Sequence, residues 1–195
     1  MHHTLHYYNQ NAEQYFRSTV HADLSETYGR FLRYLAPGAR ILDAGCGSGR
    51  DAAQFVARGF DAEGLDASEE LAEIAGRELG VRVHVGDMTT WIAEEPYDGI
   101  WCCAALLHLE DEGVAGFFRN LRLNLRPGGV LYVSVKEGIE TGTDEKGRYM
   151  RNFTEEEILQ LMRGAGLEVP ECWSTADTLD RGGFRWVNAI GRLAL

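Results

Sequence analysis

The feature that most constrains the fold of this chain is a regular alternation of short apolar segments with amphipathic ones, starting near Arg40. Five segments have the apolar and β-branched content of buried strands: residues 40–43, 61–66, 82–85, 97–103 and 130–136. Helical periodicity predicts helices over residues 51–58, 68–79, 111–125 and 154–162. Strands that alternate with helices predict a parallel sheet with helices on both faces.

The C-terminal part departs from this alternation. Two strand-like segments, 167–174 and 184–193, follow each other with no helical segment between them, so they should pair antiparallel through a turn at 180–183. Pro170 lies inside the first of them. Because proline lacks the N–H that a central strand donates, this segment is predicted to be the edge of the sheet.

The N-terminal residues predict helices that precede the sheet. Asn9 is positioned to cap a first helix, and Asp23 with Glu26 has the spacing of a capping box for a second, which ends before Pro37. A chain of 195 residues has the length of one domain. We therefore expect a single domain over 1–195, with a helical cap over 1–36 and an α/β core over 37–195.

A glycine-rich turn lies between the first predicted strand and the first helix of the core. Residues 43–49 have the sequence DAGCGSG, at the place where open α/β sheets bind ligands. Glycine allows backbone angles and close approaches that other residues resist. Arg50 occupies the last glycine position of a dinucleotide fingerprint, and no phosphate-binding P-loop follows. By itself the turn is equally compatible with a structural role.

Two carboxylates follow the next two strands. Asp66 ends the second strand, about 20 residues beyond the glycine turn, where an acidic side chain can accept both hydroxyls of a ribose. Asp87 follows the third strand and precedes Met88, where a carboxylate can accept a hydrogen bond from an adenine amino group. The alternatives are a helix cap for Asp66 and a turn residue for Asp87. The three features together favour a nucleoside site.

This order of motifs resembles that of class I S-adenosylmethionine-dependent methyltransferases. Residues 41–49 resemble the first motif of that family, and Asp66, Asp87 with Met88, and the segments 97–100 and 125–129 resemble its later motifs. The resemblance implies an α/β fold: a Rossmann-like, doubly wound, seven-stranded sheet in the order 3-2-1-4-5-7-6 with strand 7 antiparallel. Segment 101–108 is also loosely similar to the tellurite-resistance methyltransferase group.

The resemblance further implies S-adenosylmethionine as cofactor and methyl transfer to a small-molecule acceptor. Carried over by motif, the cofactor-binding residues are Asp43, Gly45, Cys46, Gly47, Gly49, Asp66, Ala67, Asp87, Met88, Cys103 and Ala104. Transfer from a sulfonium requires mainly alignment, and a base only if the nucleophile carries a proton. The loose similarity to the tellurite-resistance group adds soft nucleophiles, such as thiols and species derived from selenium or tellurium oxyanions, to the candidate acceptors.

Residues for the acceptor side are expected in the strand-end loops and the N-terminal helices. His108 lies just past the fourth strand and is the candidate catalytic residue, with an ordinary helix-entry role as the alternative. The candidate substrate residues are Tyr7, Tyr15, His21, Lys136 and Arg148, and Tyr8 is a further candidate for a lid. Core packing and an inert surface loop are the alternatives for these positions.

Composition restricts the partners. The 19 Lys and Arg against 30 Asp and Glu give a net charge of −11 without a basic run, so no nucleic-acid partner is expected. The longest uncharged stretch, 99–109, is too short for a membrane span, and no secretory signal is expected.

Four cysteines without a CxxC motif favour reduced thiols in the cytoplasm. No metal site is expected, and the protein is expected to be a monomer or homodimer.

Two other functions remain open. A module that binds S-adenosylmethionine without turnover would have the same motifs, because alignment chemistry requires no obligatory catalytic residue. A nicotinamide-dependent oxidoreductase is disfavoured by the incomplete fingerprint. Tyr132 and Lys136 have the Tyr-x-x-x-Lys spacing of short-chain dehydrogenases, but on a strand this spacing separates the side chains by roughly 13 Å.

Overall fold

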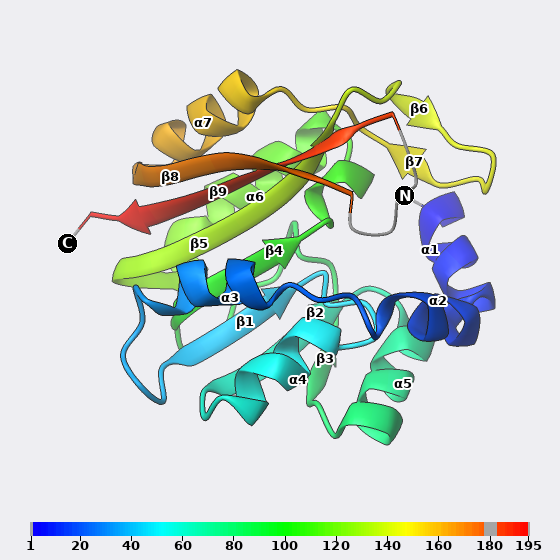
Figure 1. Ribbon diagram of the computed structural model, residues 1–195, viewed down its shortest axis with the longest axis horizontal. Helices are drawn as coiled ribbons and strands as arrows, with labels where there is room; N and C mark the ends of the chain where they lie inside the picture. The colour runs from blue at the N-terminus through cyan, green and yellow to red at the C-terminus, as the bar shows by residue number, and fades with distance from the viewer. Residues whose placement is uncertain (1, 178–182, 195) are drawn as a thin grey trace.

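The computed structural model describes residues 2–177 and 183–194, which are built around a seven-stranded sheet in the order β3-β2-β1-β4-β5-β9-β8 (Figure 1). The strands are β1 (Arg40–Ala44), β2 (Asp61–Asp66), β3 (Val83–Val85), β4 (Tyr97–Cys103), β5 (Leu125–Glu137), β8 (Leu167–Ala176) and β9 (Arg185–Leu193). Strands β1 to β5 pair parallel, and β9 is antiparallel to both β5 and β8. The predicted α/β class, strand order and antiparallel last strand are confirmed.

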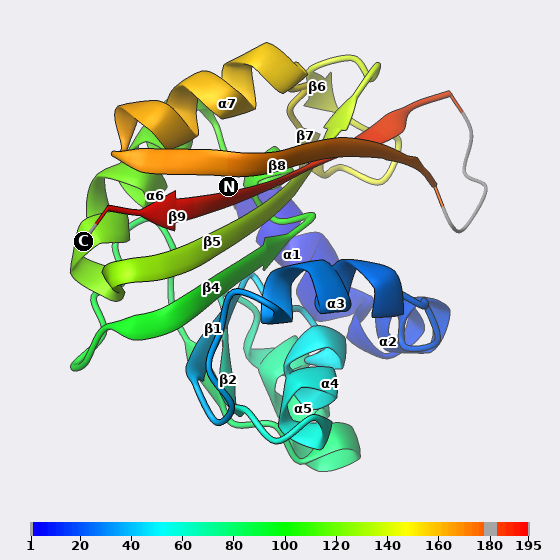
Figure 2. The same ribbon diagram turned by 60° about the vertical axis from the view of Figure 1, so that its left-hand side comes forward.

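Helices cover both faces of the sheet (Figure 2). The helices are α1 (His2–Gln10), α2 (Ala12–Thr19), α3 (Ser25–Leu32), α4 (Arg50–Ala57), α5 (Glu69–Leu79), the 3-10 helix η1 (Leu106–His108), α6 (Asp111–Asn124) and α7 (Glu155–Gly164). Helices α3 and α4 contribute to the apolar cluster on one face, and α6 and α7 to the cluster on the other. The sheet therefore lies between two separate apolar layers.

Alternating side chains of the central strands fill these two layers. Ile100 and Cys102 of β4 face the layer beneath α6, whereas Trp101 between them faces the layer beneath α3. The Trp101 ring stacks on Tyr132 of β5 with ring centroids 3.8 Å apart. Trp101 is fully buried, as expected of a core residue.

The N-terminal helices differ from the prediction. There are three helices, and Asn9 lies within α1 instead of capping a helix. Its side-chain oxygen accepts a hydrogen bond from Ser68 Oγ at 2.5 Å, because α1 packs against α5. Asp23 accepts the N–H of Ser25 at 2.9 Å, but the residue that caps α3 is Leu24, so the predicted capping box does not form.

Strand β5 begins earlier than expected. Helix α6 ends at Asn124, and Leu125 already pairs with Tyr97 of β4, so the segment 125–129 belongs to the strand. Sheet pairing overrides the turn preference of the Pro-Gly-Gly sequence here. Farther along, the segment between the predicted strand 130–136 and the predicted helix 154–162 contains a small hairpin, β6 (Gly142–Thr143) and β7 (Tyr149–Met150).

Strand β8 lies at the edge of the sheet, as Pro170 predicted. The pairing register with β9 shifts between Glu168 and Glu171, on either side of the proline. The predicted turn at 180–183 lies mostly outside the described residues. Among the described helices, none is both long and apolar enough to cross a bilayer.

Candidate functional site

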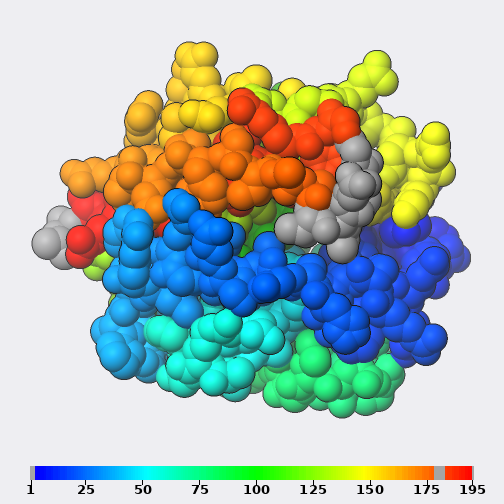
Figure 3. Space-filling view, in the orientation of Figure 1, coloured from blue at the N-terminus to red at the C-terminus, as the bar shows by residue number. Residues whose placement is uncertain are grey.

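Two adjacent cavities open at the carboxyl ends of the central strands. We call them the Asp66 cavity, of about 250 Å³, and the Arg50 cavity, of about 140 Å³. Six residues line both cavities and are called here the shared wall: Tyr8, Tyr15, Gly45, Cys103, Ala104 and His108. Helices α1 and α2, which carry the two tyrosines, form a continuous band with α3 across this face of the molecule in Figure 3.

Asp66 holds the glycine turn and the start of α5 together. Its carboxylate accepts the backbone N–H of Gly47 at 2.7 Å and that of Ser68 at 2.9 Å. Burial raises the pKa of Asp66, against the opposing effect of these backbone donors. Each carboxylate oxygen has a second lone pair. Asp66 can therefore accept further hydrogen bonds from a ligand in the cavity that it lines.

Gly45 lets the turn approach the segment that follows β4. Its φ is +73°, and a Cβ atom there would lie 2.4 Å from Ala105 Cβ and 3.6 Å from Met88 Sδ. A contact of 2.4 Å is not tolerated in a packed structure. Only glycine fits at this point of the cavity wall.

Asp87 is a turn residue that also faces a cavity. Its carboxylate accepts the N–H of Thr89 at 2.8 Å, and its carbonyl oxygen accepts that of Trp91 at 2.9 Å, as in a turn. Asp87 also lines the Asp66 cavity with Met88. A turn residue and a ligand contact are compatible at this position.

The charges and apolar surfaces of the Asp66 cavity fit S-adenosylmethionine better than a dinucleotide. Asp66 and Asp87 line it, and no lysine or arginine within residues 2–177 and 183–194 does. Two carboxylates repel a pyrophosphate and attract a cation. The side chains of Leu65, Met88 and Leu109 supply an apolar surface for a ring. The residues present thus suit an adenosine that carries a positive charge.

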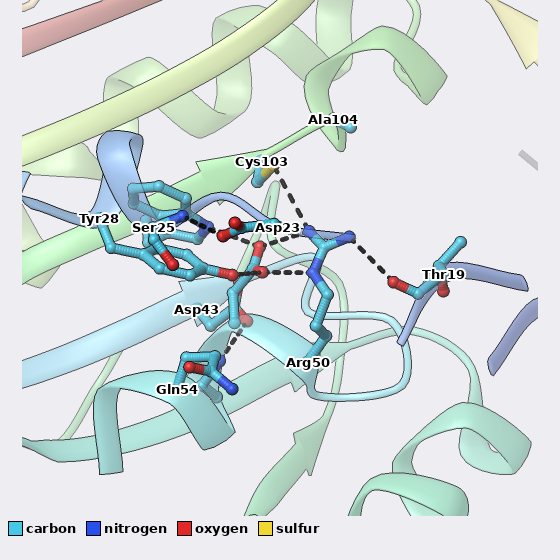
Figure 4. Close-up of polar contacts among 12 residues, drawn as sticks. Thr19, Asp23, Ser25, Tyr28, Asp43, Arg50, Gln54, Cys103 and Ala104 are labelled. Carbon is cyan, nitrogen blue, oxygen red and sulfur yellow. Dashed lines mark hydrogen bonds and ion pairs between the residues drawn. The ribbon is translucent and has the colours of Figure 1, made fainter. Parts of the chain in front are cut away.

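The Arg50 cavity contains a buried ion pair. Arg50 donates to both carboxylate oxygens of Asp51, at 2.6 and 2.9 Å, and Figure 4 shows its guanidinium between Tyr28 and Thr19. Asp51 also accepts the hydroxyl of Tyr28 at 2.6 Å and the indole N–H of Trp101 at 2.8 Å. Burial raises the pKa of Asp51, but Arg50 and these donors bring it below its usual value.

His108 joins three segments at the shared wall. Its Nδ1 lies 2.8 Å from the carbonyl oxygen of Tyr149, and its Nε2 lies 2.9 Å from Tyr8 Oη. Burial lowers the pKa of His108 to about 4, so the imidazole is neutral at pH 7. Burial also raises the pKa of Cys103 to about 12, so this residue presents a thiol.

The structure brings most of the predicted site residues to one of the two cavities. Those that line a cavity are Gly45, Cys46, Gly47, Asp66, Ala67, Asp87, Met88, Cys103, Ala104, His108, Tyr15, Lys136 and Arg148. They come from segments that are far apart in the sequence, which places the predicted cofactor and substrate residues on one contiguous surface.

Four predicted residues do not line either cavity. Asp43 is buried beneath the turn, where its carboxylate accepts the N–H of Ala52 at 3.1 Å. Gly49 is the N-cap residue of α4, and a Cβ atom there would lie 2.8 Å from Ala75 Cβ. Tyr7 packs edge-on against Tyr8, and His21 is exposed.

Sequence reasoning misses the roles of Tyr8, Arg50 and Asp51. The sequence predicts for Tyr8 only a place in a lid, because its exact position depends on how α1 docks. Arg50 and Asp51 directly follow the glycine turn at the N-terminus of a helix beside a predicted ligand site. That position is the available signal, but the motif comparison treats Arg50 only as a departure from the dinucleotide pattern.

A family model described as "Methyltransferase domain" matches residues 16–171. The chain belongs to this methyltransferase family. The resemblance to class I S-adenosylmethionine-dependent methyltransferases is thereby confirmed, and with it, at the level of the family, S-adenosylmethionine as the cofactor.

One curated relative of this chain is dTDP-4-amino-2,3,4,6-tetradeoxy-D-glucose N,N-dimethyltransferase from Saccharopolyspora spinosa. The two are 34% identical over 109 residues, which cover 53% of this chain and 43% of the relative. The alignment thus spans less than half of that relative.

Solved structures support the fold. The Burkholderia thailandensis 1,6-didemethyltoxoflavin-N1-methyltransferase, with bound 1,6-didemethyltoxoflavin and S-adenosylhomocysteine, superimposes with a TM-score of 0.78 at 22% identity over 98% of this chain and 85% of that one. A TehB-like S-adenosylmethionine-dependent methyltransferase from Corynebacterium glutamicum superimposes with a TM-score of 0.70 at 21% identity, covering 94% of this chain and 97% of that one.

Proposed function

We propose that this methyltransferase transfers the methyl group of S-adenosylmethionine to a small molecule, with the cofactor in the Asp66 cavity and the acceptor in the Arg50 cavity. The observation that carries the proposal is the shared wall, because six residues that line both cavities would place ligands in the two cavities next to each other. The cofactor supplies an already activated methyl group, so alignment is the main task left to the protein.

The chain's own residues suggest how the cofactor would be held. Asp66 would accept the ribose hydroxyls, Asp87 would accept the adenine amino group, and the backbone of Met88 would contact the ring. Gly45 and Gly47 would let the turn approach the amino-acid end. Asp43 and Gly49 would act indirectly, because they hold α4 and the turn in place.

The acceptor side is polar but its charges are largely paired. Arg50 pairs with Asp51, and Arg148 pairs with Asp144 at 2.7 Å. Lys136 lies with its ammonium 4.1 Å from the centroid of the Phe184 ring. We propose a polar acceptor of modest size, with His108 beside the point of transfer.

Calorimetric titration with S-adenosylmethionine and S-adenosylhomocysteine tests the cofactor assignment, with NADH as the control ligand. Incubation with methyl-labelled S-adenosylmethionine and a metabolite pool then tests transfer. We expect binding of both adenosyl ligands and a labelled small-molecule product. Binding without transfer across a broad pool would instead support a sensor, and binding of NADH alone would support an oxidoreductase.

We also propose that the protein works in the cytoplasm as one domain, either as a monomer or as a homodimer. All four cysteines lie among the described residues and are free thiols, which suits a reducing compartment. Light scattering coupled to size-exclusion chromatography measures the oligomeric state directly.

A further inference from the structure

We propose that Tyr8 selects the methyl acceptor, because its hydroxyl oxygen offers only a lone pair to the shared wall and so binds acceptors that carry an N–H or O–H group. This inference rests on the proposed function and specifies the substrate class of the same site. It assigns a specificity-determining role to a residue of α1 that the sequence motifs do not include.

The first step concerns the hydrogen on His108 Nδ1. This nitrogen lies 2.8 Å from the carbonyl oxygen of Tyr149, which can only accept a hydrogen bond. Nδ1 therefore carries the hydrogen. The carbonyl is held in place because Tyr149 pairs with Thr143 in the β6–β7 hairpin and its N–H donates to Thr4 Oγ1 at 2.8 Å.

The second step fixes the direction of the next hydrogen bond. A neutral imidazole with its hydrogen on Nδ1 has an unprotonated Nε2, which can only accept. Tyr8 Oη lies 2.9 Å from that nitrogen, so the tyrosine donates its hydroxyl hydrogen to His108. The hydroxyl hydrogen of Tyr8 therefore points toward His108 and not toward a ligand.

The third step concerns the other neighbour of the Tyr8 oxygen. Arg148 Nη1 lies 3.4 Å from this oxygen and donates to it. Two further hydrogen bonds from Arg148 to Asp144, at 2.9 and 2.7 Å, hold the guanidinium in place. Both neighbours thus keep Tyr8 in one orientation. Toward a third partner, the Tyr8 oxygen can only accept a hydrogen bond.

The consequence is a preference among nucleophiles. Tyr8 lines both cavities, so an acceptor at the point of transfer contacts it. An amine, a hydroxyl or a ring N–H can donate to the oxygen and direct its own lone pair elsewhere. A thiolate, a carboxylate or another oxyanion has no hydrogen to donate. Its lone pairs would face the lone pair of the Tyr8 oxygen and repel it. Thiolates and tellurium oxyanions are therefore disfavoured among the soft nucleophiles that the loose similarity to the tellurite-resistance group suggests.

The first experiment measures the His108 tautomer by nitrogen-15 NMR at pH 7 in the intact protein, with His108→Gln to assign the signals. We expect a protonated Nδ1 and an unprotonated Nε2. In Tyr8→Phe we expect only the Nε2 signal to shift strongly. A hydrogen on Nε2, or on both nitrogens, would overturn the proposal.

The second experiment compares phenol with anisole, which has nearly the same shape but no donor, in protein saturated with S-adenosylhomocysteine. We expect phenol to bind about tenfold or more tightly, a ratio that falls toward one in Tyr8→Phe. The control is Tyr34→Phe, which removes a hydroxyl bonded to Glu171 at 2.7 Å and should leave the ratio unchanged. An unchanged ratio in Tyr8→Phe, tighter binding of anisole or benzoate, or no phenol binding would each contradict the proposal.

The two proposals fail differently. If calorimetry detects no S-adenosylmethionine binding, the proposed function is wrong. The His108 tautomer and the preference for phenol over anisole can still be measured in protein without S-adenosylhomocysteine. If the cofactor binds and the phenol preference is absent, the methyltransferase assignment stands and the role of Tyr8 is wrong.

Discussion

At the scale of single residues, several side chains at the site have a structural role and also line a cavity. Asp66 connects the glycine turn to α5 through Gly47 and Ser68 and lines the larger cavity. Asp87 closes a turn and lines the same cavity. A structural hydrogen bond and a ligand contact are therefore not alternatives at these positions, because a carboxylate has enough lone pairs for both.

Asp66→Ala should abolish measurable S-adenosylmethionine binding in a calorimetric titration. Loss of two charge-assisted hydrogen bonds, worth roughly 1.5–3 kcal/mol each, weakens binding by about a hundredfold or more. Asp61→Ala is the matched control, because Asp61 is an exposed carboxylate at the other end of the same strand. Wild-type affinity in a folded Asp66→Ala protein would remove Asp66 from the site.

Gly45→Ala should destabilise the fold and weaken cofactor binding. A left-handed φ and a Cβ contact of 2.4 Å with Ala105 together cost about 2–4 kcal/mol in the free energy of unfolding. Gly29→Ala is the opposite control: Gly29 lies in α3, and a Cβ atom there would have nothing within 4 Å, so alanine should stabilise by about 0.5–1 kcal/mol. Urea denaturation measures both, and equal effects of the two substitutions would refute this account.

At the scale of elements, two of the described helices begin with a side-chain cap. Ser68 accepts the N–H of Leu71 at 3.2 Å at the start of α5, and Thr154 accepts that of Glu157 at 3.1 Å at the start of α7. Ser68 has a second contact, because its hydroxyl donates to Asn9. One side chain thus starts α5 and attaches α1 to it.

Ser68→Ala should therefore cost more stability than Thr154→Ala. We expect about 1 kcal/mol for Thr154→Ala, the usual value of a cap, and about 2 kcal/mol for Ser68→Ala, which also loses the contact with α1. In chemical denaturation, a double-mutant cycle of Ser68→Ala with Asn9→Ala should show a coupling near 1 kcal/mol. Additive effects of these two substitutions would mean that the contact contributes nothing.

At the scale of the whole molecule, burial at the site makes stability depend on pH. His108 has a pKa of about 4 in the fold, below its usual 6.5. As the pH falls through this window, the unfolded chain binds a proton that the folded protein does not, so stability is lost. Carboxylates with a lowered pKa, such as Glu63 and Asp51, contribute stability above their unfolded values and lose it at lower pH.

The difference between wild type and His108→Gln isolates the histidine, because the carboxylates are common to both. Between pH 7 and pH 5, the free energy of unfolding of the wild type should fall by about 2 kcal/mol more than that of His108→Gln. Exposed His6 provides the control substitution, His6→Gln, which should follow the wild type. Parallel pH profiles for wild type and His108→Gln would show that burial of His108 carries no such cost.

Much of the fold was predictable because its signals are local. Apolar strands, helix periodicity and Pro170 are properties of short segments. Pro170 predicted the edge strand directly, whereas the order of the sheet was predicted through the family resemblance. The exceptions are places where distant contacts compete with local preference. Leu125 pairs with Tyr97 despite the following Pro-Gly-Gly, and Asn9 bonds to Ser68 instead of capping a helix.

The sequence by itself determined the α/β class, the family and the position of the glycine turn and its two carboxylates, because each depends on residues near one another in the chain and on parallel strands that end at one edge. Only the tertiary structure decided which tyrosine of α1 meets His108, and that Arg50 is neutralised by Asp51 beside the smaller cavity. The physical reason is that hydrogen-bond direction and charge pairing depend on the packing of segments up to about 100 residues apart, which no local pattern encodes.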